Sequence, residues 1–265
     1  MKYDIIVLGS GPAGLSAAVT ARGRNKSVLV IGNRWQDSPL ARAERVDNYL
    51  GMPGMTGMEM LEAFQRHAQE MGGEMVTGKV LSIMEWEGFN LTVGSQLYQG
   101  SALILAPGVV RQAKFPGEET YLGRGVSYCA TCDGMLYRGK RAAVIGLAAD
   151  APEEAGFLRE IGCDVHYYDG KKHRFEIRGA ERADTLVVDG TAEPADVVFI
   201  LRAGFAADTL LPGLATDNGH IVVDDDCAAS IPGVFAAGDC TGGLLQISKA
   251  VGEGAKAAMS MIRFV

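Results

Sequence analysis

The sequence predicts an α/β protein with two Rossmann-like, dinucleotide-binding domains, the second inserted in the first and truncated. Three observations predict this fold. An apolar strand runs into a glycine-rich turn at residues 4–14, and a second strand leads to a glycine turn at 231–239. Between them, residues 141–154 form a strand and turn of the same kind with a degraded glycine pattern. The expected domains are residues 1–112 with 206–265, and 113–205. The first segment is also expected to contain a helix over Gly57–Met71 and an antiparallel layer from Met75 to Leu97.

Composition excludes several classes of protein. With 265 residues, 48% of them hydrophobic, the chain is long enough for one large or two modest globular domains. A formal net charge of −7 argues against nucleic acid or an anionic membrane surface as the main partner. No apolar run approaches the roughly 20 residues that span a bilayer, and the start of the chain does not match a signal peptide. We therefore expect a cytoplasmic, cofactor-binding protein.

The N-terminal turn carries the strongest motif. Residues 4–8 are a buried strand, and Gly9-Ser-Gly-Pro-Ala-Gly14 follows at once. Gly9 permits the tight turn, Gly11 lets the backbone approach a pyrophosphate, and Gly14 lets the helix pack on the strand. A helix at 15–22 and a second strand at 27–31 complete a βαβ unit. The second strand ends in Gly32-Asn33 instead of the acidic residue that commonly binds a ribose hydroxyl.

A second glycine site lies near the C-terminus. Residues 234–237 are predicted to form a strand, and Gly238-Asp239 the turn that leaves it. The alanine-rich segment 246–263 is predicted to be a helix, whose N-terminus would face another part of the same cofactor. A Gly-Asp turn alone is common. Its occurrence together with the N-terminal βαβ unit is what favours a cofactor-binding role.

The five cysteines do not form a secreted disulfide framework, because their number is odd and their spacing irregular. Only Cys129 and Cys132 are close, as Cys-Ala-Thr-Cys. A zinc site needs two further ligands, and neither a second such pair nor clustered histidines supply them. A structural disulfide is unexpected in a reducing compartment. A redox dithiol fits best, with Asp133 as the group that exchanges the proton.

These motifs resemble those of low-molecular-weight thioredoxin reductases, which the chain is similar to over about 1–145 and 205–265. The resemblance rests on the N-terminal βαβ unit, Val46-Asp-Asn-Tyr49, Cys129-Ala-Thr-Cys-Asp-Gly134 and Ala236-Ala-Gly-Asp239, in that order. It implies non-covalent FAD in a discontinuous domain, no metal, and a homodimer. The residues that it implies for FAD binding are Gly9, Ser10, Gly11, Pro12, Ala13, Gly14, Gly32, Asn33, Asn48, Val80, Ala106, Gly108, Gly238, Asp239, Gln246 and Ile247.

The resemblance also implies separate roles for the two cysteines. Cys132 would face flavin C4a, and Cys129 would attack the disulfide of thioredoxin or a similar small protein. One departure concerns the family's Ala-Thr-Gly turn, which reads Ala106-Pro-Gly108 here, so a hydroxyl and a backbone donor are missing.

The middle of the chain departs further from a nicotinamide-binding domain. After the strand at 141–146, Ala148 replaces the glycine that a pyrophosphate approaches, and Asp150, Glu153 and Glu154 crowd the helix start. The next strand, 164–168, ends in Asp169 without the His-Arg-Arg cluster that binds a 2′-phosphate in NADPH-using relatives. Strands at 175–178 and 185–188 then form a meander before the strand at 195–201, so the second half of a dinucleotide fold is missing.

We therefore predict a flavin-dependent disulfide reductase for which NADPH and NADH are poor donors and reduced ferredoxin is the donor. The chain resembles ferredoxin-dependent flavin thioredoxin reductases in Asn48-Tyr-Leu-Gly51, Tyr128–Asp133 and 236–242. Three alternatives stay open: an NAD(P)H-dependent reductase with an atypical nucleotide site, a flavin-dependent dithiol oxidase, and a non-catalytic FAD-binding scaffold. An acidic ferredoxin would need a basic patch. The candidates are Lys171, Lys172, Arg174 and Arg178, or Arg22, Arg24 and Lys26.

Overall fold

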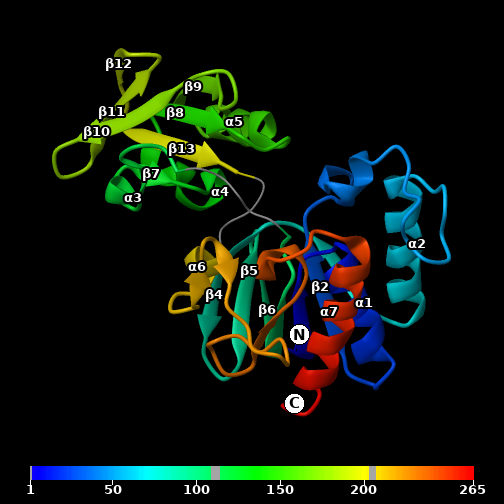
Figure 1. The fold of residues 1–265 in the computed structure, drawn as a ribbon. Coiled ribbons are helices and arrows are strands. Elements are labelled where there is room, and N and C mark those ends of the chain that lie inside the picture. Colours follow the sequence, from blue (N-terminus) through cyan, green and yellow to red (C-terminus); the bar gives the residue numbers. More distant parts are fainter. Residues whose placement is uncertain (1, 109–113, 203–206) are drawn as a thin grey trace. The chain divides into compact units, whose positions relative to one another are not determined.

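The computed structural model describes residues 2–108, 114–202 and 207–265, and the chain divides into two compact units (Figure 1). Unit 1 comprises Met1–Arg111 and Gly204–Val265, and unit 2 comprises Gln112–Ala203. Unit 1 is therefore discontinuous in sequence, with unit 2 inserted in it.

Unit 1 is built on a seven-stranded sheet whose parallel part holds the N-terminal motif. Its order is β3-β2-β1-β6, and β16 pairs in parallel with the far side of β6. Four of these strands are apolar and buried over most of their length, as expected for strands covered on both faces. They are β1 (Lys2–Leu8), β2 (Val28–Gly32), β6 (Gln96–Leu105) in its second half, and β16 (Val234–Ala236). The fifth parallel strand, β3 (Glu74–Thr77), lies at the edge of the sheet and is only partly buried.

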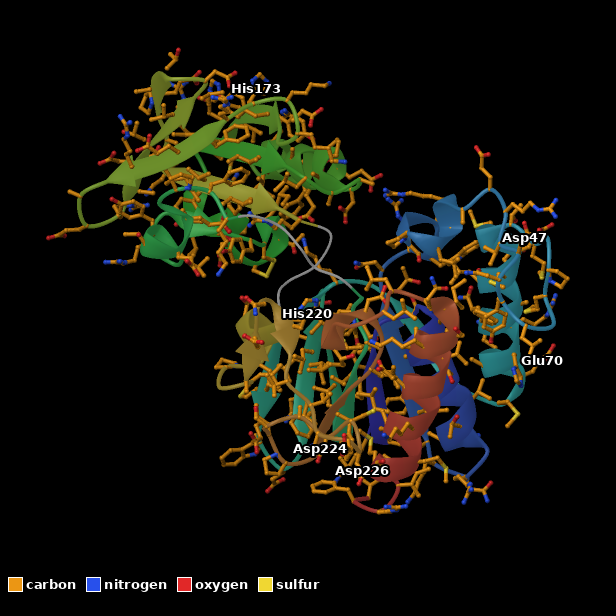
Figure 2. The ribbon with its side chains drawn as sticks, viewed as in Figure 1. Asp47, Glu70, His173, His220, Asp224 and Asp226 are labelled. Carbon is orange, nitrogen blue, oxygen red and sulfur yellow. A yellow bond between two sulfur atoms is a disulfide. The ribbon has the colours of Figure 1, made fainter. Side chains whose placement is uncertain are left out.

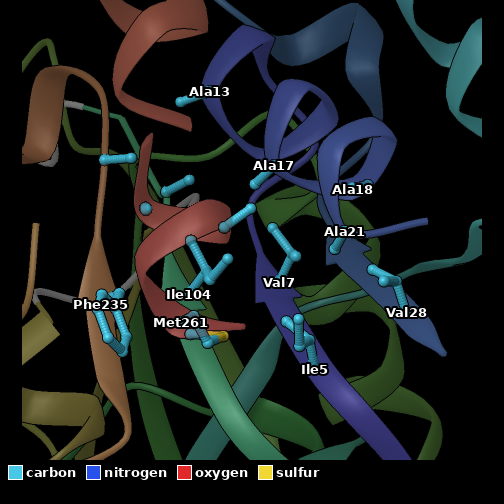
Figure 3. Close-up of a cluster of buried hydrophobic side chains, with 14 of the residues drawn as sticks. Ile5, Val7, Ala13, Ala17, Ala18, Ala21, Val28, Ile104, Phe235 and Met261 are labelled. Carbon is cyan, nitrogen blue, oxygen red and sulfur yellow. The ribbon is translucent and has the colours of Figure 1, made fainter. Parts of the chain in front are cut away.

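Two helices cover one face of this sheet. Helix α1 (Pro12–Arg22) presents a row of alanines to β1 and β6, while α7 (Ile247–Met261) packs directly against α1 (Figure 3). Gly254 makes this close approach possible, because a methyl group there would overlap the carbonyl oxygen of Ala13. Ser16 Oγ also donates to Val251 O, 2.7 Å away.

The other face of the sheet has its own apolar core, which includes residues of the segment after β13. Helix α2 (Gly57–Glu70) begins with a reciprocal capping box, in which Thr56 and Glu59 bond each other's backbone N–H groups. Shorter elements complete the unit: η1 (Trp35–Asp37), η2 (Leu40–Arg42), α6 (Ala207–Leu210), β14 (Thr216–Asp217), β15 (His220–Ile221) and η4 (Asp239–Thr241).

One boundary expected from the sequence is wrong. An antiparallel layer was expected from Met75 to Leu97, but Met75 belongs to β3, which pairs in parallel with β2. The antiparallel layer starts later, with β4 (Val80–Glu85) and β5 (Phe89–Val93), and β5 pairs with the first half of β6. β3 pairs with the buried, apolar strand β2. The alternation of apolar and polar residues within β3 does not predict this pairing, because it depends on the partner strand.

Unit 2 has a four-stranded parallel sheet in the order β7-β13-β8-β9. Helix α5 (Ala151–Glu160) is its one crossover helix of more than four residues among the residues described. The strands are β7 (Val126–Ser127), β8 (Arg141–Gly146), β9 (Asp164–Asp169) and β13 (Val197–Leu201), and the short helices are α3 (Glu118–Tyr121), α4 (Ala130–Asp133) and η3 (Gly134–Tyr137).

A three-stranded antiparallel meander follows β9, as the sequence predicts. It consists of β10 (Phe175–Gly179), β11 (Ala183–Val188) and β12 (Thr191–Pro194). No helix intervenes between β9 and β13 in this fully described stretch, so the second crossover of a complete dinucleotide fold is replaced by the meander. Among the helices described in either unit, none is long and apolar enough to cross a membrane.

Candidate functional site

The cofactor-binding residues expected in unit 1 gather at the carboxyl edge of its parallel strands. The turn that starts at Gly9 follows β1, Gly32 ends β2, Ala106 follows β6 and Gly238 follows β16. Ligands bind at this edge in open α/β sheets, where successive crossovers diverge. These four turns therefore form one site from segments as far apart as residues 9 and 238.

The glycines of the first turn serve two distinct purposes. A methyl group at Gly9 would overlap the carbonyl oxygen of Ala106, and one at Gly14 would overlap that of Gly9, so packing alone requires both glycines. Gly11 differs, because a methyl group there would meet no protein atom within 4 Å. Its φ of −83° also suits any residue. The open space beside Gly11 is a cradle that a ligand can enter.

The N-terminus of α1 is equipped to bind an anion. The helix has Gly11 as its N-cap, without a side-chain hydrogen bond, and no acidic residue in its first turn. Pro12 has no N–H, so the first N–H groups of the helix are those of Ala13 and Gly14, which have no acceptor one turn earlier in the helix. The helix dipole adds partial positive charge at this end. Ser10 and Gly32 lie side by side here, since a methyl group at Gly32 would lie 2.7 Å from Ser10 Cβ.

The turn after β16 brings Asp239 to the same edge. Burial raises the pKa of the Asp239 carboxyl, Lys249 opposes the rise and Glu253 adds to it. A methyl group at Gly238 would lie 2.8 Å from Ala13 Cβ, which places this turn directly beside the start of α1. The sequence did not single out Lys249 or Glu253, although their i,i+4 spacing at the predicted helix start was a usable signal.

Two further expected residues are joined by a hydrogen bond. Asn48 Nδ2 donates to Gln246 Oε1 over 2.9 Å, so the loop after η2 is tied to the N-cap of α7. Val80 is placed differently, since its side chain is buried in the apolar core. Only its backbone remains for a ligand, and Gly78 N–H, which donates to Gly32 O, holds that segment near the end of β2.

Unit 2 carries the dithiol, which is a disulfide between Cys129 and Cys132 at the start of α4. The two sulfurs have unlike surroundings. Cys129 is buried and its Sγ lies 3.1 Å from the backbone nitrogen of Cys132 and 3.4 Å from Thr131 Oγ1. Cys132 is exposed in the described structure. A nucleophile would therefore reach Cys132, and the departing Cys129 thiolate would be stabilised by nearby donors.

Asp133 is held by Ser127, a residue that the sequence did not single out. Ser127 Oγ lies 2.7 Å from Asp133 Oδ2, and it accepts the backbone N–H of Cys129 over 3.1 Å. Ser127 is buried on β7, two residues before the first cysteine. The serine thus connects the carboxylate to the backbone of the dithiol.

The remaining cysteines are free and buried, as expected of small core residues. Burial raises the pKa of the Cys163 and Cys227 thiols and raises that of Cys240 to about 12. All three therefore stay protonated near neutral pH and are unreactive.

The glycine turn of unit 2, between β8 and α5, is closed by the protein itself. The backbone N–H groups of Leu147 and Ala148 both donate to Leu201 O, over 2.9 and 3.0 Å. The Tyr167 phenol covers Gly146, where a methyl group would overlap it. Glu153 and Glu154 occupy the first turn of α5. Two N–H groups of this turn and the space above Gly146 are therefore not available to a phosphate.

The first basic patch expected from the sequence, at 171–178, is partly neutralised, because two of its four basic side chains form ion pairs. Lys172 pairs with Asp169 over 3.1 Å, and Arg178 pairs with Glu176. His173, marked in Figure 2, pairs with Asp189 over 2.7 Å. In the second patch, Arg22 and Lys26 donate to backbone carbonyls of Lys26, Met71 and Val265.

A buried ion pair lies behind the dithiol segment. Arg202 forms two hydrogen bonds to the Glu118 carboxylate, which is fully buried and also accepts the Tyr128 hydroxyl over 2.7 Å. Phe115 N–H donates to the same carboxylate, and its ring lies beneath the Arg202 guanidinium. The cluster joins the segments that begin and end unit 2 to the residue preceding Cys129.

Comparisons with known proteins agree with this geometry. The sequence profile of the pyridine nucleotide-disulphide oxidoreductases matches residues 3–177 and 171–254. The chain belongs to the pyridine nucleotide-disulphide oxidoreductase family. Within it, the thioredoxin reductase of Bacillus subtilis is 31% identical over 301 residues, covering 99% of this chain and 95% of the relative. That aligned length exceeds the 265 residues here, so the relative carries segments that this chain lacks.

Solved structures of this oxidoreductase family are similar over the whole chain. A ferredoxin-flavin thioredoxin reductase from Clostridium acetobutylicum is 36% identical, with a TM-score of 0.92, covering 100% of this chain and 97% of that one. A thioredoxin reductase from Gloeobacter violaceus is 30% identical, with a TM-score of 0.86, covering 99% and 94%. The chain is thus a thioredoxin reductase-type disulfide oxidoreductase. No cluster of potential metal ligands occurs among the residues described.

Proposed function

We propose that this protein is a flavin-dependent thioredoxin reductase that takes its electrons from a ferredoxin. In this scheme, the residues of unit 1 would hold FAD, which would supply two electrons for the Cys129–Cys132 disulfide, and the resulting dithiol reduces thioredoxin or a similar small disulfide protein. The observation that carries the proposal is the contrast between an open glycine turn in unit 1 and a closed one in unit 2.

The residues of unit 1 fit FAD. The space beside Gly11 and the free N–H groups of α1 suit a pyrophosphate. Asp239 suits a ribityl hydroxyl, and the Asn48–Gln246 pair with the N-terminus of α7 suits the flavin ring. Bound FAD would supply a centre that accepts electrons singly and releases them as a pair. No cysteine or histidine is assigned to a covalent link.

The chemistry at the dithiol balances with two electrons and two protons. The electron pair breaks the Sγ–Sγ bond at the exposed Cys132, and Cys129 becomes the thiolate, next to Cys132 N–H and Thr131. The Cys129 thiolate then attacks the thioredoxin disulfide and forms a mixed disulfide. Cys132 resolves it, restoring the original bond, while both thioredoxin sulfurs leave as thiols. Asp133 exchanges a proton during these steps.

A nucleotide donor does not fit unit 2. Two backbone N–H groups that would face a pyrophosphate are bound to Leu201 O, and the glutamates in the first turn of α5 would repel phosphate. Asp169 ends β9, and its pKa is lowered by hydrogen bonds to Lys171 N–H and Lys172. The carboxylate is therefore engaged by its own loop. The similarity to ferredoxin-flavin thioredoxin reductases supports a protein donor instead.

The test is anaerobic mixing of FAD-loaded protein with each donor while flavin absorbance is recorded. We expect reduced ferredoxin to bleach the flavin rapidly, and micromolar NADPH or NADH to leave it oxidised. A Cys132→Ser variant is the matched control, in which ferredoxin should still reduce the flavin but thioredoxin should stay oxidised. Rapid bleaching by NADPH without bleaching by ferredoxin would restore the nucleotide-dependent reductase. A protein that takes up no FAD would refute the whole proposal.

A dithiol oxidase would require the electrons to run the other way, from thiols to oxygen. It would show fast aerobic reoxidation of the flavin coupled to thiol consumption, and flavin absorbance recorded in the presence of oxygen measures this rate. We expect thioredoxin reduction to outpace this reaction.

A further inference from the structure

Lys249 lies in the first turn of α7, and its ammonium group is enclosed by the turn that follows β16. Lys249 Nζ lies 3.0 Å from Gly238 O, 2.6 Å from Gly242 O and 3.1 Å from Thr241 Oγ1. Glu253, one turn along the helix, is 3.1 Å from the ammonium and accepts Gly238 N–H over 2.8 Å. One lysine thus contacts both ends of the turn.

The backbone of this turn needs such support. Gly238 has φ 88° and ψ −153°, and Gly242 has φ 81° and ψ −162°. This region is accessible essentially to glycine alone, and conformations of this kind persist only where their surroundings hold them. Lys249 is the side chain that binds the carbonyl groups of both glycines.

The direction of these carbonyl groups fixes the direction of two N–H groups. In a trans peptide the C=O of one residue is antiparallel to the N–H of the next, and no described peptide bond is cis. Because Gly238 O and Gly242 O point at Lys249, the N–H groups of Asp239 and Gly243 point away from it. Neither has a hydrogen-bond acceptor in the described part of the chain. Two free donors therefore leave the turn on the side opposite the ammonium.

We infer that Lys249 is a positioning residue for the cofactor, orienting the Asp239 and Gly243 N–H groups toward phosphate or ribityl oxygens. The inference rests on the proposed FAD binding in unit 1. Gly238, which begins the turn, lies beside Ala13 at the start of α1, so this end of the turn adjoins the cradle at Gly11. Glu253 balances the charge of the lysine, so the network orients the backbone of the turn and adds little net charge to the site.

Stability alone does not account for such a network. A largely desolvated ion pair contributes little to folding compared with an apolar pair of the same volume. The side chains of Lys249 and Glu253 are only 19% and 28% exposed. Orientation of the turn is the property that an apolar pair would not supply.

The test compares FAD binding to apoprotein variants by quenching of flavin fluorescence, together with apoprotein melting. We expect Lys249→Met to weaken FAD binding about 10–100-fold, the effect of losing one or two well-made hydrogen bonds. The double variant Lys249→Met/Glu253→Gln leaves no uncompensated carboxylate and should show the same loss with the apoprotein folded. Lys256→Met, an exposed lysine on the same helix, is the matched control and should bind FAD normally.

The outcomes separate the two proposals. Unchanged FAD affinity in both lysine variants would overturn the positioning role while leaving FAD binding intact. An equal drop in apoprotein and holoprotein melting temperature, without a change in affinity, would likewise reduce the network to a structural one. Failure of the unaltered protein to bind FAD would instead refute the proposed function itself.

Discussion

The β1–α1 turn of unit 1 and the β8–α5 turn of unit 2 have the same topology but opposite availability to a ligand. At the first, Gly11 faces open space and no acidic residue enters the helix start. At the second, Leu147 and Ala148 donate their N–H groups to Leu201 O, and Tyr167 covers Gly146. A strand, turn and helix therefore do not make a nucleotide site unless the donors are left free.

The difference arises from small changes in sequence. Gly-x-Gly-x-x-Gly leaves room for a ligand backbone to approach, whereas Gly146-Leu-Ala-Ala-Asp-Ala151 folds its own N–H groups onto the neighbouring strand β13. Glu153 and Glu154 interact favourably with the dipole at the start of α5. The two carboxylates thus occupy the role that an anionic ligand has at an open turn. Unit 2 thus retains the fold as a carrier for the dithiol.

The largest effect is expected when a carboxylate is added to the open β1–α1 turn, and the same addition to the closed β8–α5 turn tests whether the two turns differ. Gly11→Glu should weaken FAD binding by about a thousandfold or more, because the side chain fills the cradle and repels the pyrophosphate. The fold should survive, since φ at Gly11 suits any residue and no atom lies nearby. Apoprotein titration with FAD measures the loss, and circular dichroism checks the fold.

Ala149→Glu adds a carboxylate to the closed turn of unit 2, at an exposed position one residue after the counterpart of Gly11. We expect it to leave FAD binding and ferredoxin-dependent activity within about twofold of the unaltered protein, the range of surface substitutions. If both variants lost FAD equally, the two turns would not differ in function.

A smaller effect concerns the buried ion pair of unit 2. Burial on its own raises the pKa of the Glu118 carboxyl, but hydrogen bonds from Arg202, Phe115 and Tyr128 outweigh it and lower the pKa overall. Glu118→Gln leaves Arg202 without its charged partner and should lower the unfolding free energy by about 3–5 kcal/mol near neutral pH. Denaturant titration of the apoprotein measures this.

The pH dependence has a definite sign. A carboxyl with a lowered pKa stabilises the fold above its unfolded pKa of about 4.3, and the contribution is lost as pH falls through the folded value. The difference between the unaltered protein and Glu118→Gln should therefore shrink as pH falls below about 4. Glu119→Gln, whose carboxylate is exposed beside Lys114, should change stability by less than about 1 kcal/mol. Equal effects at both positions would contradict the role of the buried pair.

The next effect concerns the packing of α7 against α1, the helix that follows the open turn. Gly254→Ala should lower stability by roughly 1–3 kcal/mol, because the methyl group overlaps Ala13 O between α7 and α1. In unit 2, Gly156→Ala on α5 meets no atom within 4 Å and should raise stability by about 0.5–1 kcal/mol. Gly252→Ala on α7, equally unobstructed, controls for helix propensity. Thermal melts of the three variants check the opposite signs.

Much of this arrangement was predictable from the sequence, because strong local patterns coincide with tertiary roles. The strand–glycine–helix order located α1, and Ala148 with the two glutamates indicated a defective second turn. The meander of unit 2 was predictable from its short strands and from the few residues available. The parallel pairing of β3 was not, since it depends on the buried partner β2.

Contacts formed by side chains far apart in sequence were beyond prediction. Ser127 is an ordinary serine until β7 places it 2.7 Å from Asp133. Arg202 and Glu118 are 84 residues apart and meet only in the folded unit. The use of the Leu147 and Ala148 N–H groups depends on β13, which follows about 50 residues later. Pattern thus located the candidate turns, whereas the hydrogen bonds decided which one is open.

The smallest expected effect tests which feature keeps the second turn closed. If the missing glycine alone excluded NADPH, Ala148→Gly would allow flavin reduction by this nucleotide. We expect no measurable gain, because Ala148 N–H and Leu147 N–H would still donate to Leu201 O and Tyr167 would still cover Gly146. Adding Glu153→Gln and Glu154→Gln removes the repulsion but not those contacts, so this triple variant should also stay inactive with NADPH. Anaerobic stopped-flow with millimolar NADPH measures both variants. Reduction at a rate approaching that with ferredoxin would show that the side chains, and not the hydrogen bonds to β13, exclude the nucleotide.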